Sequence, residues 1–155
     1  MRSVRFQRER FTDAFDDALP LLEQHRQEIA HFQDILLDVD VRLYCNADVS
    51  DRLRVYTARD GDRLVGYACY FVGSNPHYQA SKQAKQDVLY LHPDYRAGRT
   101  GLRLVEFADA QLAIEGVQCV YHHVKDAHPA LGRILGFLGY EPVERVYVKR
   151  LDRKG

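Results

Sequence analysis

A loop of glycines and arginines separates a short apolar run from an amphipathic run within residues 87–106. The apolar run Val88–Leu91 stops at His92-Pro93, which is typical of a strand that ends at a turn. A helical pattern begins just after Gly98, so the segment predicts a strand, a tight loop and a helix. The loop places two glycines, two arginines and a hydroxyl where the backbone N–H groups of a helix lack partners. This arrangement favours an anion-binding site.

The spacing excludes the two common nucleotide loops. The segment has neither the Gly-Lys-Ser/Thr ending of a P-loop nor the G-x-G-x-x-G order of a dinucleotide fold. It resembles instead the acetyl-CoA pyrophosphate loop of the GNAT superfamily of N-acetyltransferases, whose Leu-x-Val-x-Pro-x-Tyr-Arg approach matches residues 89–96. Arg96 and Gly101 match the first and last motif positions, while Arg99 replaces the middle glycine. A second resemblance to this family lies in residues 135–142, which read L-G-F-L-G-Y-E-P.

Hydrophobic periodicity predicts the other elements of the chain. Asp60-Gly61 predicts a hairpin, and Gly116 and Gly139 are expected to end helices. The expected elements are a strand at 3–8, helices from 12 to about 32 interrupted at Pro20, a functional loop region at 31–51 with a short helix or strand, strands at 53–58 and 64–72, a polar loop at 74–86, a helix after Gly98, a strand at 117–124, a helix at 129–138 and a strand at 143–148. This order predicts the α+β class.

The resemblance makes the fold expectation more specific. It implies an α/β/α sandwich with a GNAT-like, mostly antiparallel sheet of six to seven strands and about four helices. The 155 residues are then one N-acetyltransferase domain, residues 1–155.

The amino-acid composition limits which kinds of molecule the protein is expected to bind. The 22 basic and 22 acidic residues cancel, which argues against a general affinity for nucleic acid or membrane. Three widely spaced cysteines favour neither a disulfide framework nor a zinc site, and the histidines stand at no helical metal-ligand spacing with a carboxylate. We therefore expect no metal, no membrane-spanning segment and a cytoplasmic location.

The resemblance implies which residues hold acetyl-CoA. The strand before the loop would offer its backbone to the pantetheine arm and to the thioester oxygen. His128 stands where the family often has an asparagine that contacts the pantetheine. The implied co-substrate-binding residues are Leu89, Tyr90, Leu91, Arg96, Ala97, Gly98, Arg99, Thr100, Gly101 and His128.

The catalytic candidates follow from the needs of acetyl transfer to an amine, which requires a proton acceptor and a donor for the leaving thiolate. Asp87 is a candidate base or amine ligand. His122 and His123 are consecutive on a predicted strand, so one of them can face the cleft, and His123 is our candidate. Many family members have a tyrosine that acts as general acid at the position of Leu135. Because this chain has leucine there, Tyr140 is the nearest candidate for the general acid.

The acceptor stays open at the level of sequence. The resemblance implies a primary amine of a small molecule or a protein, and aspartates at 34, 38, 40 and 48 would favour a cationic acceptor if they form an acidic lip. Two alternatives remain: a catalytically silent CoA-binding regulator, and an acetyltransferase acting on a nucleic-acid-linked amine. The second would need the basic residues near 82–103 and 149–154 to form one surface. Dimers through sheet edges are common in the family, so a homodimer is a further hypothesis.

Overall fold

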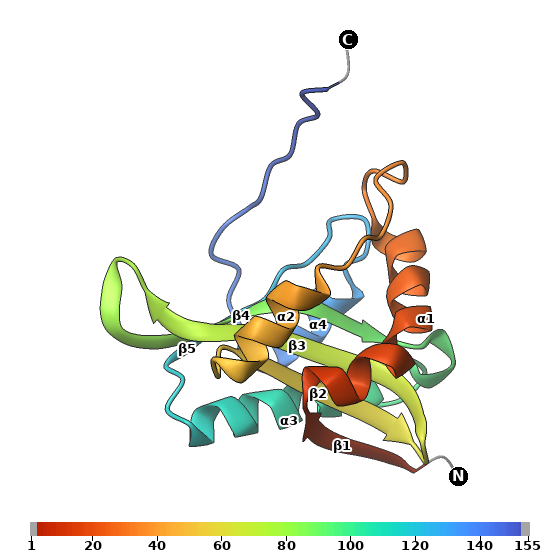
Figure 1. The fold of residues 1–155 in the computed structure, drawn as a ribbon, viewed down its shortest axis with the longest axis horizontal. Coiled ribbons are helices and arrows are strands. Elements are labelled where there is room, and N and C mark those ends of the chain that lie inside the picture. The colour runs from red at the N-terminus through yellow and green to blue at the C-terminus, as the bar shows by residue number, and fades with distance from the viewer. Residues whose placement is uncertain (1–2, 153–155) are drawn as a thin grey trace.

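The computed structural model describes residues 3–152 and consists of one sheet between two layers of helices (Figure 1). Its strands follow one another across the sheet in the order β1-β2-β3-β4-β5, antiparallel except for the parallel pair β4–β5. The elements are β1 (Val4–Glu9), α1 (Phe11–Ile29), α2 (Val41–Val49), β2 (Leu53–Asp60), β3 (Arg63–Asn75), β4 (Tyr78–Leu91), the 3-10 helix η1 (Pro93–Tyr95), α3 (Thr100–Ile114), β5 (Cys119–Tyr121) and α4 (Ala130–Phe137). The predicted α+β sandwich is confirmed, but the described residues form five strands rather than six to seven.

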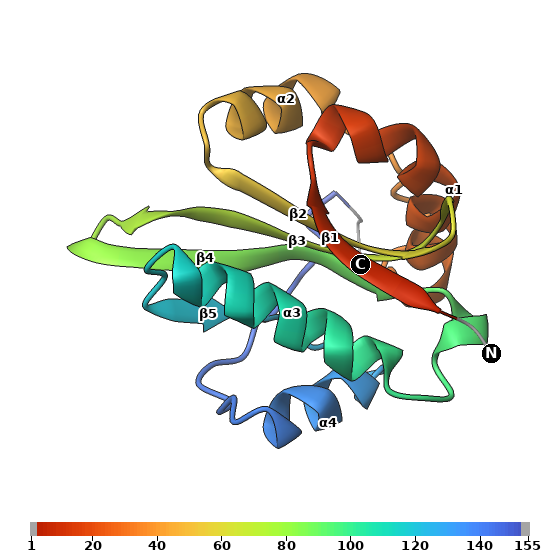
Figure 2. The same cartoon turned by 90° about the horizontal axis from the view of Figure 1, so that it is seen from below.

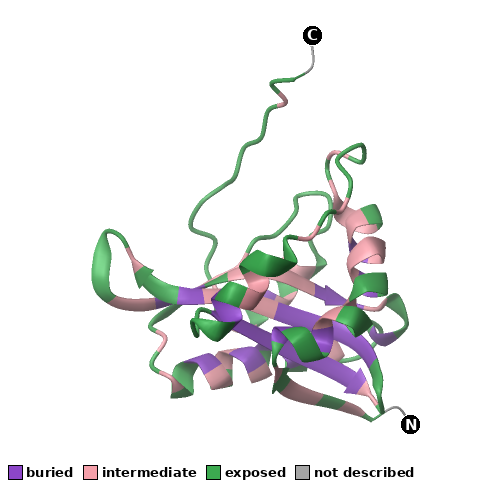
Figure 3. Ribbon diagram, viewed as in Figure 1, coloured by how far each residue is buried: buried purple, intermediate pink, exposed green. Residues whose placement is uncertain are grey.

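The helices divide between the two faces of the sheet (Figure 2). Helices α1 and α2 cover one face, and α3 and α4 lie on the other. The α3 side holds the largest group of packed apolar side chains, in which Leu104, Ala108 and Leu112 of α3 meet Tyr56 and Tyr70 of the sheet. Smaller clusters lie on the α1 side. Burial is densest along β2 and β3, so the sheet is the rigid part of the molecule (Figure 3).

Three glycines end elements where the sequence predicts it. Gly61 turns the β2–β3 hairpin at a φ of 61°. Gly116 and Gly139 follow α3 and α4 at φ values of 84° and 91°. Because positive φ is unfavourable for residues that carry a Cβ, glycine at these places fixes where the chain changes direction.

Two boundaries differ from the sequence prediction. Helix α1 runs through Pro20 without ending, because its buried face from Phe11 to His25 packs on the sheet and outweighs the lost backbone hydrogen bond. Residues 74–86, predicted as a polar loop, mostly belong to a long β3–β4 ribbon that turns between Asn75 and Tyr78. The outer part of this ribbon is exposed, so its side chains are mostly polar although most of its backbone is paired with β3, apart from a register shift between Ser74 and Asn75.

The predicted last strand, 143–148, is wrong as part of this sheet. In the described chain, residues 140–150 have no regular structure and extend away from the body (Figure 1). The predicted strand 117–124 is shortened to Cys119–Tyr121, which pairs with Gln83–Lys85. Both differences have one cause, since a strand forms only where a neighbouring strand satisfies its backbone.

Two arginines of β2 tie the layers together. Arg59 donates to Glu9 of β1 at 2.8 Å from Nε and to Asp17 of α1 at 2.9 Å. At the other end of the strand, Arg54 forms a bidentate pair with Glu115, just after α3. Both arginine side chains are almost fully buried. These charges hold the helices at the two ends of β2, and loss of Arg59 would leave Glu9, whose side chain is only 10% exposed, without its arginine partner.

A buried histidine connects α1 to β4. His25 stacks on Tyr90 with ring centroids 4.6 Å apart, and its Nδ1 lies 3.0 Å from the Tyr67 hydroxyl. Burial lowers the pKa of His25 to about 4, so the ring is neutral in the folded protein at neutral pH.

This pKa predicts a pH-dependent stability. The unfolded histidine binds a proton near pH 6.5, whereas the folded one binds it only near pH 4, so stability falls as the pH is lowered through that window. We expect His25 to contribute roughly 1 to 3 kcal/mol of this loss. Urea unfolding between pH 7 and 4 should give a smaller pH slope for His25→Gln than for the wild type, and an unchanged slope for the exposed His77→Gln. An unchanged slope in His25→Gln would contradict this account.

Candidate active site

The sheet opens between β4 and β5. Their parallel pairing ends at Lys85 and Tyr121, while β4 continues to Leu91 along β3. Beyond Lys85 the edge of β4 that faces β5 is therefore left without a strand partner in the described chain. Backbone N–H and C=O groups that face an opening of this kind are available to a ligand that can lie along the strand.

A β-bulge lies at the start of this opening. Cys69 pairs with Val88 and Tyr70 pairs with Gln86, so Asp87 is an extra residue without a counterpart on β3. The extra residue brings both Asp87 and Val88 to the α1 and α2 side of the sheet, where they line one cavity. Bulges commonly redirect a side chain at a functional site, and this one directs a carboxylate. The sequence carries no signal for it.

Asp87 is held by a tyrosine that sequence reasoning missed. The Tyr44 hydroxyl, on α2, donates to Oδ2 of Asp87 at 2.7 Å. Burial raises the pKa of Asp87 above its ordinary value, although the Tyr44 hydrogen bond and the nearby His123 both lower it. His123 is exposed and is the second residue after β5. His123 is thus near enough to affect the pKa of Asp87, and burial increases the affinity of this carboxylate for protons.

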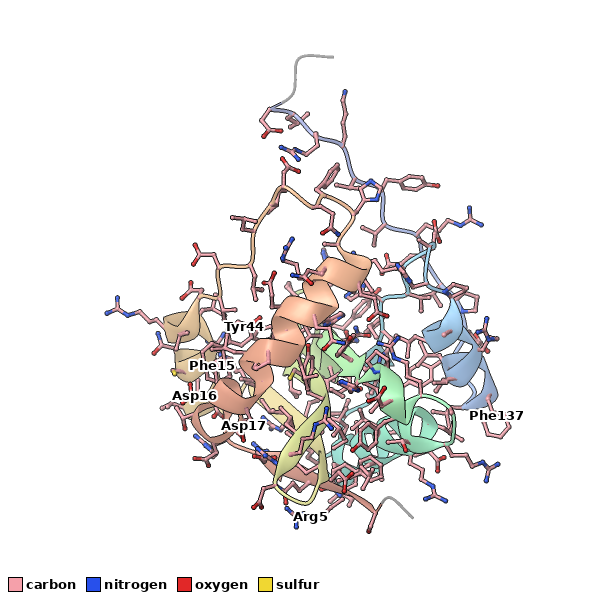
Figure 4. All side chains as sticks on the ribbon, turned by 90° about the vertical axis from the view of Figure 1, so that its right-hand side faces the viewer. Arg5, Phe15, Asp16, Asp17, Tyr44 and Phe137 are labelled. Atoms are coloured by element: carbon pink, nitrogen blue, oxygen red, sulfur yellow. The ribbon has the colours of Figure 1, made fainter. Side chains whose placement is uncertain are left out.

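An apolar cavity of about 130 Å³ adjoins Asp87. It lies between the sheet and the helices α1 and α2, and Figure 4 places Phe15 of α1 and Tyr44 of α2 on this side of the molecule. Its lining is Phe11, Ala14, Phe15, Ala18, Leu22, Leu37, Val39, Tyr44, Leu53, Val55, Thr57, Leu64, Tyr67, Cys69, Asp87 and Val88. Asp87 is the only charged side chain in that lining.

The N-terminus of α3 lies beyond the far end of β4. No side chain caps it, whereas the Asp40 side chain caps α2 by accepting from Leu43 N–H at 3.0 Å. The first intrahelical hydrogen bond of α3 runs from the Arg103 N–H to the Arg99 carbonyl at 2.9 Å. The backbone N–H groups that precede Arg103 therefore make no intrahelical hydrogen bond. Arg99 and Gly98 are exposed beside them. The loop and the uncapped helix start have the local structure that the sequence predicts, and anion binding there stays a prediction.

Arg96 is engaged by a carboxylate in this structure. Its Nη1 and Nη2 atoms donate to Glu28 of α1 at 2.7 and 2.9 Å, and its Nε donates to the Leu91 carbonyl at 2.8 Å. Its guanidinium also lies 5.1 Å from the ring centroid of Tyr90, whose hydroxyl donates to Glu28. Arg96 therefore anchors the loop to β4 and α1 and leaves Arg99 as the exposed cation of the loop.

The two loop glycines, Gly98 and Gly101, differ in how closely neighbouring atoms surround them. A Cβ on Gly101 would lie 3.3 Å from Ile134 Cδ1 and 3.7 Å from Leu91 Cδ2, so glycine there lets α3 approach α4 and β4. A Cβ on Gly98 would meet nothing within 4 Å. A substitution at Gly101 would therefore disturb packing as well as any ligand, and Arg99 is the better position for a test.

Other predicted co-substrate residues lie on β4 and in the segment before α4. The side chains of Leu89 and Leu91 join the apolar core on the α3 side, while Tyr90 packs on the α1 side. Alternation of this kind leaves the backbone of β4, rather than its side chains, facing β5. His128 is exposed in the segment before α4, and its N–H donates to the Lys125 carbonyl at 2.9 Å.

Tyr140 and His122 lie on the α3 side of the sheet. The Tyr140 hydroxyl donates to Asp109 of α3 at 2.6 Å, and its ring packs edge to face on His122. His122 bonds Gln86 Oε1 through Nδ1 at 2.7 Å, and burial lowers its pKa to about 4. Burial and the Asp109 bond also raise the pKa of Tyr140 above its ordinary value. These bonds fix both side chains in the packing of α3, on the face opposite Asp87.

The aspartates of the hypothetical acidic lip mostly have structural partners. Asp48 is buried and accepts from the Phe11 N–H at 2.8 Å, and Asp40 caps α2. Asp34 pairs with Arg150 at 3.0 Å. These aspartates therefore do not form an acidic lip of free carboxylates. The main features on the α1 and α2 side of the sheet are the apolar cavity and Asp87.

The described residues 3–152 contain no group of three or more potential metal ligands. Within the same range, no helix is both long and apolar enough to cross a membrane. Two of the basic side chains that a nucleic-acid surface would need are paired with carboxylates: Lys82 lies 3.3 Å from Glu115, and Arg96 pairs with Glu28.

Comparisons with known proteins agree with this geometry. The acetyltransferase (GNAT) family matches residues 9–140. An aminoglycoside acetyltransferase from an uncultured soil metagenomic sample, solved with trehalose, has a TM-score of 0.75 at 14% identity, with 97% of each chain covered. A ribosomal-protein-alanine N-acetyltransferase from Brucella melitensis has a TM-score of 0.71 at 15% identity, covering 96% of this chain and 99% of that one.

A third similar structure is a predicted acetyltransferase from Clostridium acetobutylicum, solved with acetyl-CoA. Its TM-score is 0.72 at 10% identity, with 96% of this chain and 97% of that chain covered. A search of curated protein sequences gives no significant match. The fold, with its parted strands β4 and β5, is the mixed α+β fold of these solved structures. The chain belongs to the GNAT family of acetyltransferases, and its class is therefore that of an acyltransferase enzyme.

The raised pKa of Asp87 predicts a stabilising substitution. A carboxyl whose pKa is raised on folding lowers stability at neutral pH, and this effect disappears as the pH falls below its unfolded pKa. Asp87→Asn removes the charge and keeps an oxygen for the Tyr44 hydroxyl. At pH 7 its thermal midpoint should exceed that of the wild type, whereas the exposed control Asp38→Asn should leave the midpoint unchanged. A clear fall confined to Asp87→Asn would identify a structural carboxylate instead.

Proposed function

We propose that the protein transfers an acetyl group from acetyl-CoA directly to a primary amine. The observation that carries the proposal is the opening between β4 and β5, which has Asp87 at its start and the uncapped N-terminus of α3 beyond its far end. One extended molecule with an anionic end and a reactive end fits between these two points. The proposed reaction centre is the bulge at Asp87.

The co-substrate would lie along the open edge of β4. Its pyrophosphate would bind the free N–H groups of α3 and Arg99, because an uncapped helix N-terminus and an exposed guanidinium both favour negative charge. The pantetheine would follow the backbone from Leu91 to Leu89, with His128 on the opposite side. A backbone N–H near the bulge would then polarise the thioester carbonyl.

Asp87 would receive the proton of the acceptor. The amine nitrogen attacks the thioester carbon, a C–N bond forms, the C–S bond breaks, and the departing thiolate takes a proton from solvent. A carboxylate with a raised pKa is a better proton acceptor than an exposed one. His123 is the second candidate for proton transfer, since it lies exposed near Asp87. Tyr140 would have to leave Asp109 to act as an acid, so we give it no step.

The cavity suggests which amines the site accepts. Its lining is apolar apart from a few groups that include Asp87, so an acceptor that fits it carries an ammonium group on an apolar or aromatic body. The carboxylate would bind the ammonium group and the cavity would bind the body. A polycationic amine would leave most of its charges without partners there.

The two alternatives that the sequence leaves open would behave differently from this enzyme in binding and activity assays. A silent CoA-binding regulator would bind CoA at the same loop and release no thiol when amines are added. An enzyme for a nucleic-acid-linked amine would lose acceptor affinity steeply as salt rises, because phosphate contacts release counterions. The pairing of Lys82 and Arg96 with carboxylates favours the small or protein amine.

Charge reversal at Arg99 should weaken CoA binding. Loss of one charge-assisted contact is worth about 1.5 to 3 kcal/mol, or roughly a 10- to 100-fold rise in the dissociation constant. Isothermal calorimetry with CoA should give this rise for Arg99→Glu and less than about a twofold change for Arg42→Glu, an exposed arginine on α2. No CoA binding by the wild type would overturn the proposed function. Equal binding by all three proteins would overturn the assignment of the loop.

Acceptor choice should follow the cavity. In a thiol-release assay, 2-phenylethylamine should be used with a kcat/KM at least about 10-fold higher than that of an aminosugar, because its ring buries apolar area. Ala18→Leu places extra carbon in the cavity and should raise the KM for 2-phenylethylamine without changing CoA affinity. A preference for the aminosugar, unaffected by Ala18→Leu, would contradict the apolar acceptor and leave CoA binding untouched.

A further inference from the structure

Side-chain contacts replace backbone pairing at the point where β4 and β5 part. The backbone pairing of the two strands ends at Lys85 and Tyr121. The next residues along the two strands are Gln86 and His122, and Gln86 Oε1 lies 2.7 Å from His122 Nδ1. The same oxygen accepts the backbone N–H of His123 at 3.2 Å. A glutamine side chain therefore holds the chain after β5 against β4 where the backbone ladder has stopped.

The backbone donor determines the orientation of the Gln86 amide. A backbone N–H can only donate, so the His123 N–H requires the oxygen of the amide, rather than its NH2 group, at this place. That oxygen in turn requires an N–H on Nδ1 of His122. Burial lowers the pKa of His122 to about 4, so at neutral pH the ring is neutral and carries a single N–H. His122 is therefore the Nδ1–H tautomer.

The other nitrogen of this ring contacts a third strand. Nε2 of His122 lies 3.2 Å from the hydroxyl of Tyr70, and in the Nδ1–H tautomer it accepts the hydroxyl proton. Tyr70 is fully buried on β3, and it is the register partner of Gln86. The imidazole thus bonds two cross-strand neighbours. Tyr70, Gln86 and His122, which we call the clamp, connect β3, β4 and the chain after β5.

The clamp lies directly beside the β-bulge. Tyr70 and Gln86 form the register pair on one side of the bulge, Cys69 and Val88 form the pair on the other, and Asp87 is the extra residue between them. The side chain of Gln86 contacts His122 on the α3 side of the sheet, while Asp87 lines the cavity on the opposite side. Consecutive residues of β4 therefore carry the clamp and the carboxylate of the proposed reaction centre.

We propose that Gln86 is a positioning residue for acetyl transfer and acts through the clamp. The inference rests on the proposed function, in which the thioester lies in the opening beside Asp87. Gln86 holds residues 122–123 against β4 where the opening begins, so it sets how closely the chain after β5 approaches the bulge. It touches no reacting atom. Without it the opening would widen, and a thioester displaced from the attacking amine reacts more slowly.

The tautomer of His122 tests the clamp without any substrate. Long-range proton–nitrogen NMR spectra at pH 7 should show the His122 proton on Nδ1 in the wild type, with the signal assigned by its loss in His122→Asn. Gln86→Met keeps a side chain of similar length and removes the amide oxygen, so the proton should move toward Nε2, where the Tyr70 hydroxyl can accept it. A proton on Nε2 in the wild type, or an unchanged tautomer in Gln86→Met, would overturn the clamp. The wild-type spectrum decides this even if the variant folds poorly.

Thiol-release kinetics test the positioning role. Gln86→Met should lower kcat by at least about 10-fold, because the thioester and the amine lose their alignment. Its dissociation constant for CoA should change by less than about threefold, since the proposed pyrophosphate site lies at the far end of β4. Gln86→Glu keeps oxygens that accept both N–H groups, so its kcat should stay within about threefold of the wild-type value.

Gln118→Met is the matched control. It removes the oxygen that accepts from the Ser81 hydroxyl at 2.7 Å, just before β5, and should change neither kcat nor the His122 tautomer. A wild-type kcat in Gln86→Met, or an equal loss of kcat in Gln86→Met and Gln86→Glu, would contradict the positioning role. A wild type that releases no thiol with any amine would overturn the proposed function and the role of Gln86 in it, and the His122 tautomer would still report whether the clamp exists.

Discussion

The structure depends on where β4 stops pairing. From Gln83 to Lys85 the strand is paired on both edges, and beyond Lys85 only β3 remains, so the backbone up to Leu91 has one open side. A strand in this condition keeps its shape only if its two faces are firmly packed. Tyr90 stacks on His25 on one face, and Leu89 and Leu91 enter the core beneath α3 on the other. The open edge is thus a rigid edge, which is what a site for an extended ligand requires.

The chemistry of the site also depends on the place where the pairing of β4 with β5 ends. The bulge directs Asp87 toward α2, where the Tyr44 hydroxyl orients it, and the cavity beside it excludes other charged side chains. A carboxylate in such surroundings has a raised pKa and lowers the stability of the fold at neutral pH. At the far end, α3 lacks a side-chain cap, while α2 has one. Both features reduce stability locally, and under the proposed function each would contact a ligand.

Sequence patterns correctly predicted the turns and helix ends that depend on residues adjacent in sequence. The Asp60-Gly61 hairpin, the ends of α3 and α4, and the loop before Thr100 each depend on residues adjacent in sequence. Patterns failed where distant contacts decide the outcome. Helix α1 continues through Pro20 because of its packing, the ribbon at 78–86 looks like a loop because it is exposed, and the bulge at Asp87 exists only in the register of two strands. Tyr44 was missed because its role depends on that bulge.

The central claim is that acetyl transfer takes place beside Asp87, and steady-state kinetics test it most directly. Initial rates of amine-dependent thiol release from acetyl-CoA should be compared between the wild type and Asp87→Asn, with CoA affinity measured in parallel. The account predicts a fall in kcat/KM of about 100-fold or more, as for loss of a general base, with CoA affinity unchanged. An Asp87→Asn enzyme that keeps wild-type kcat/KM would contradict the account and move the reaction centre away from the bulge.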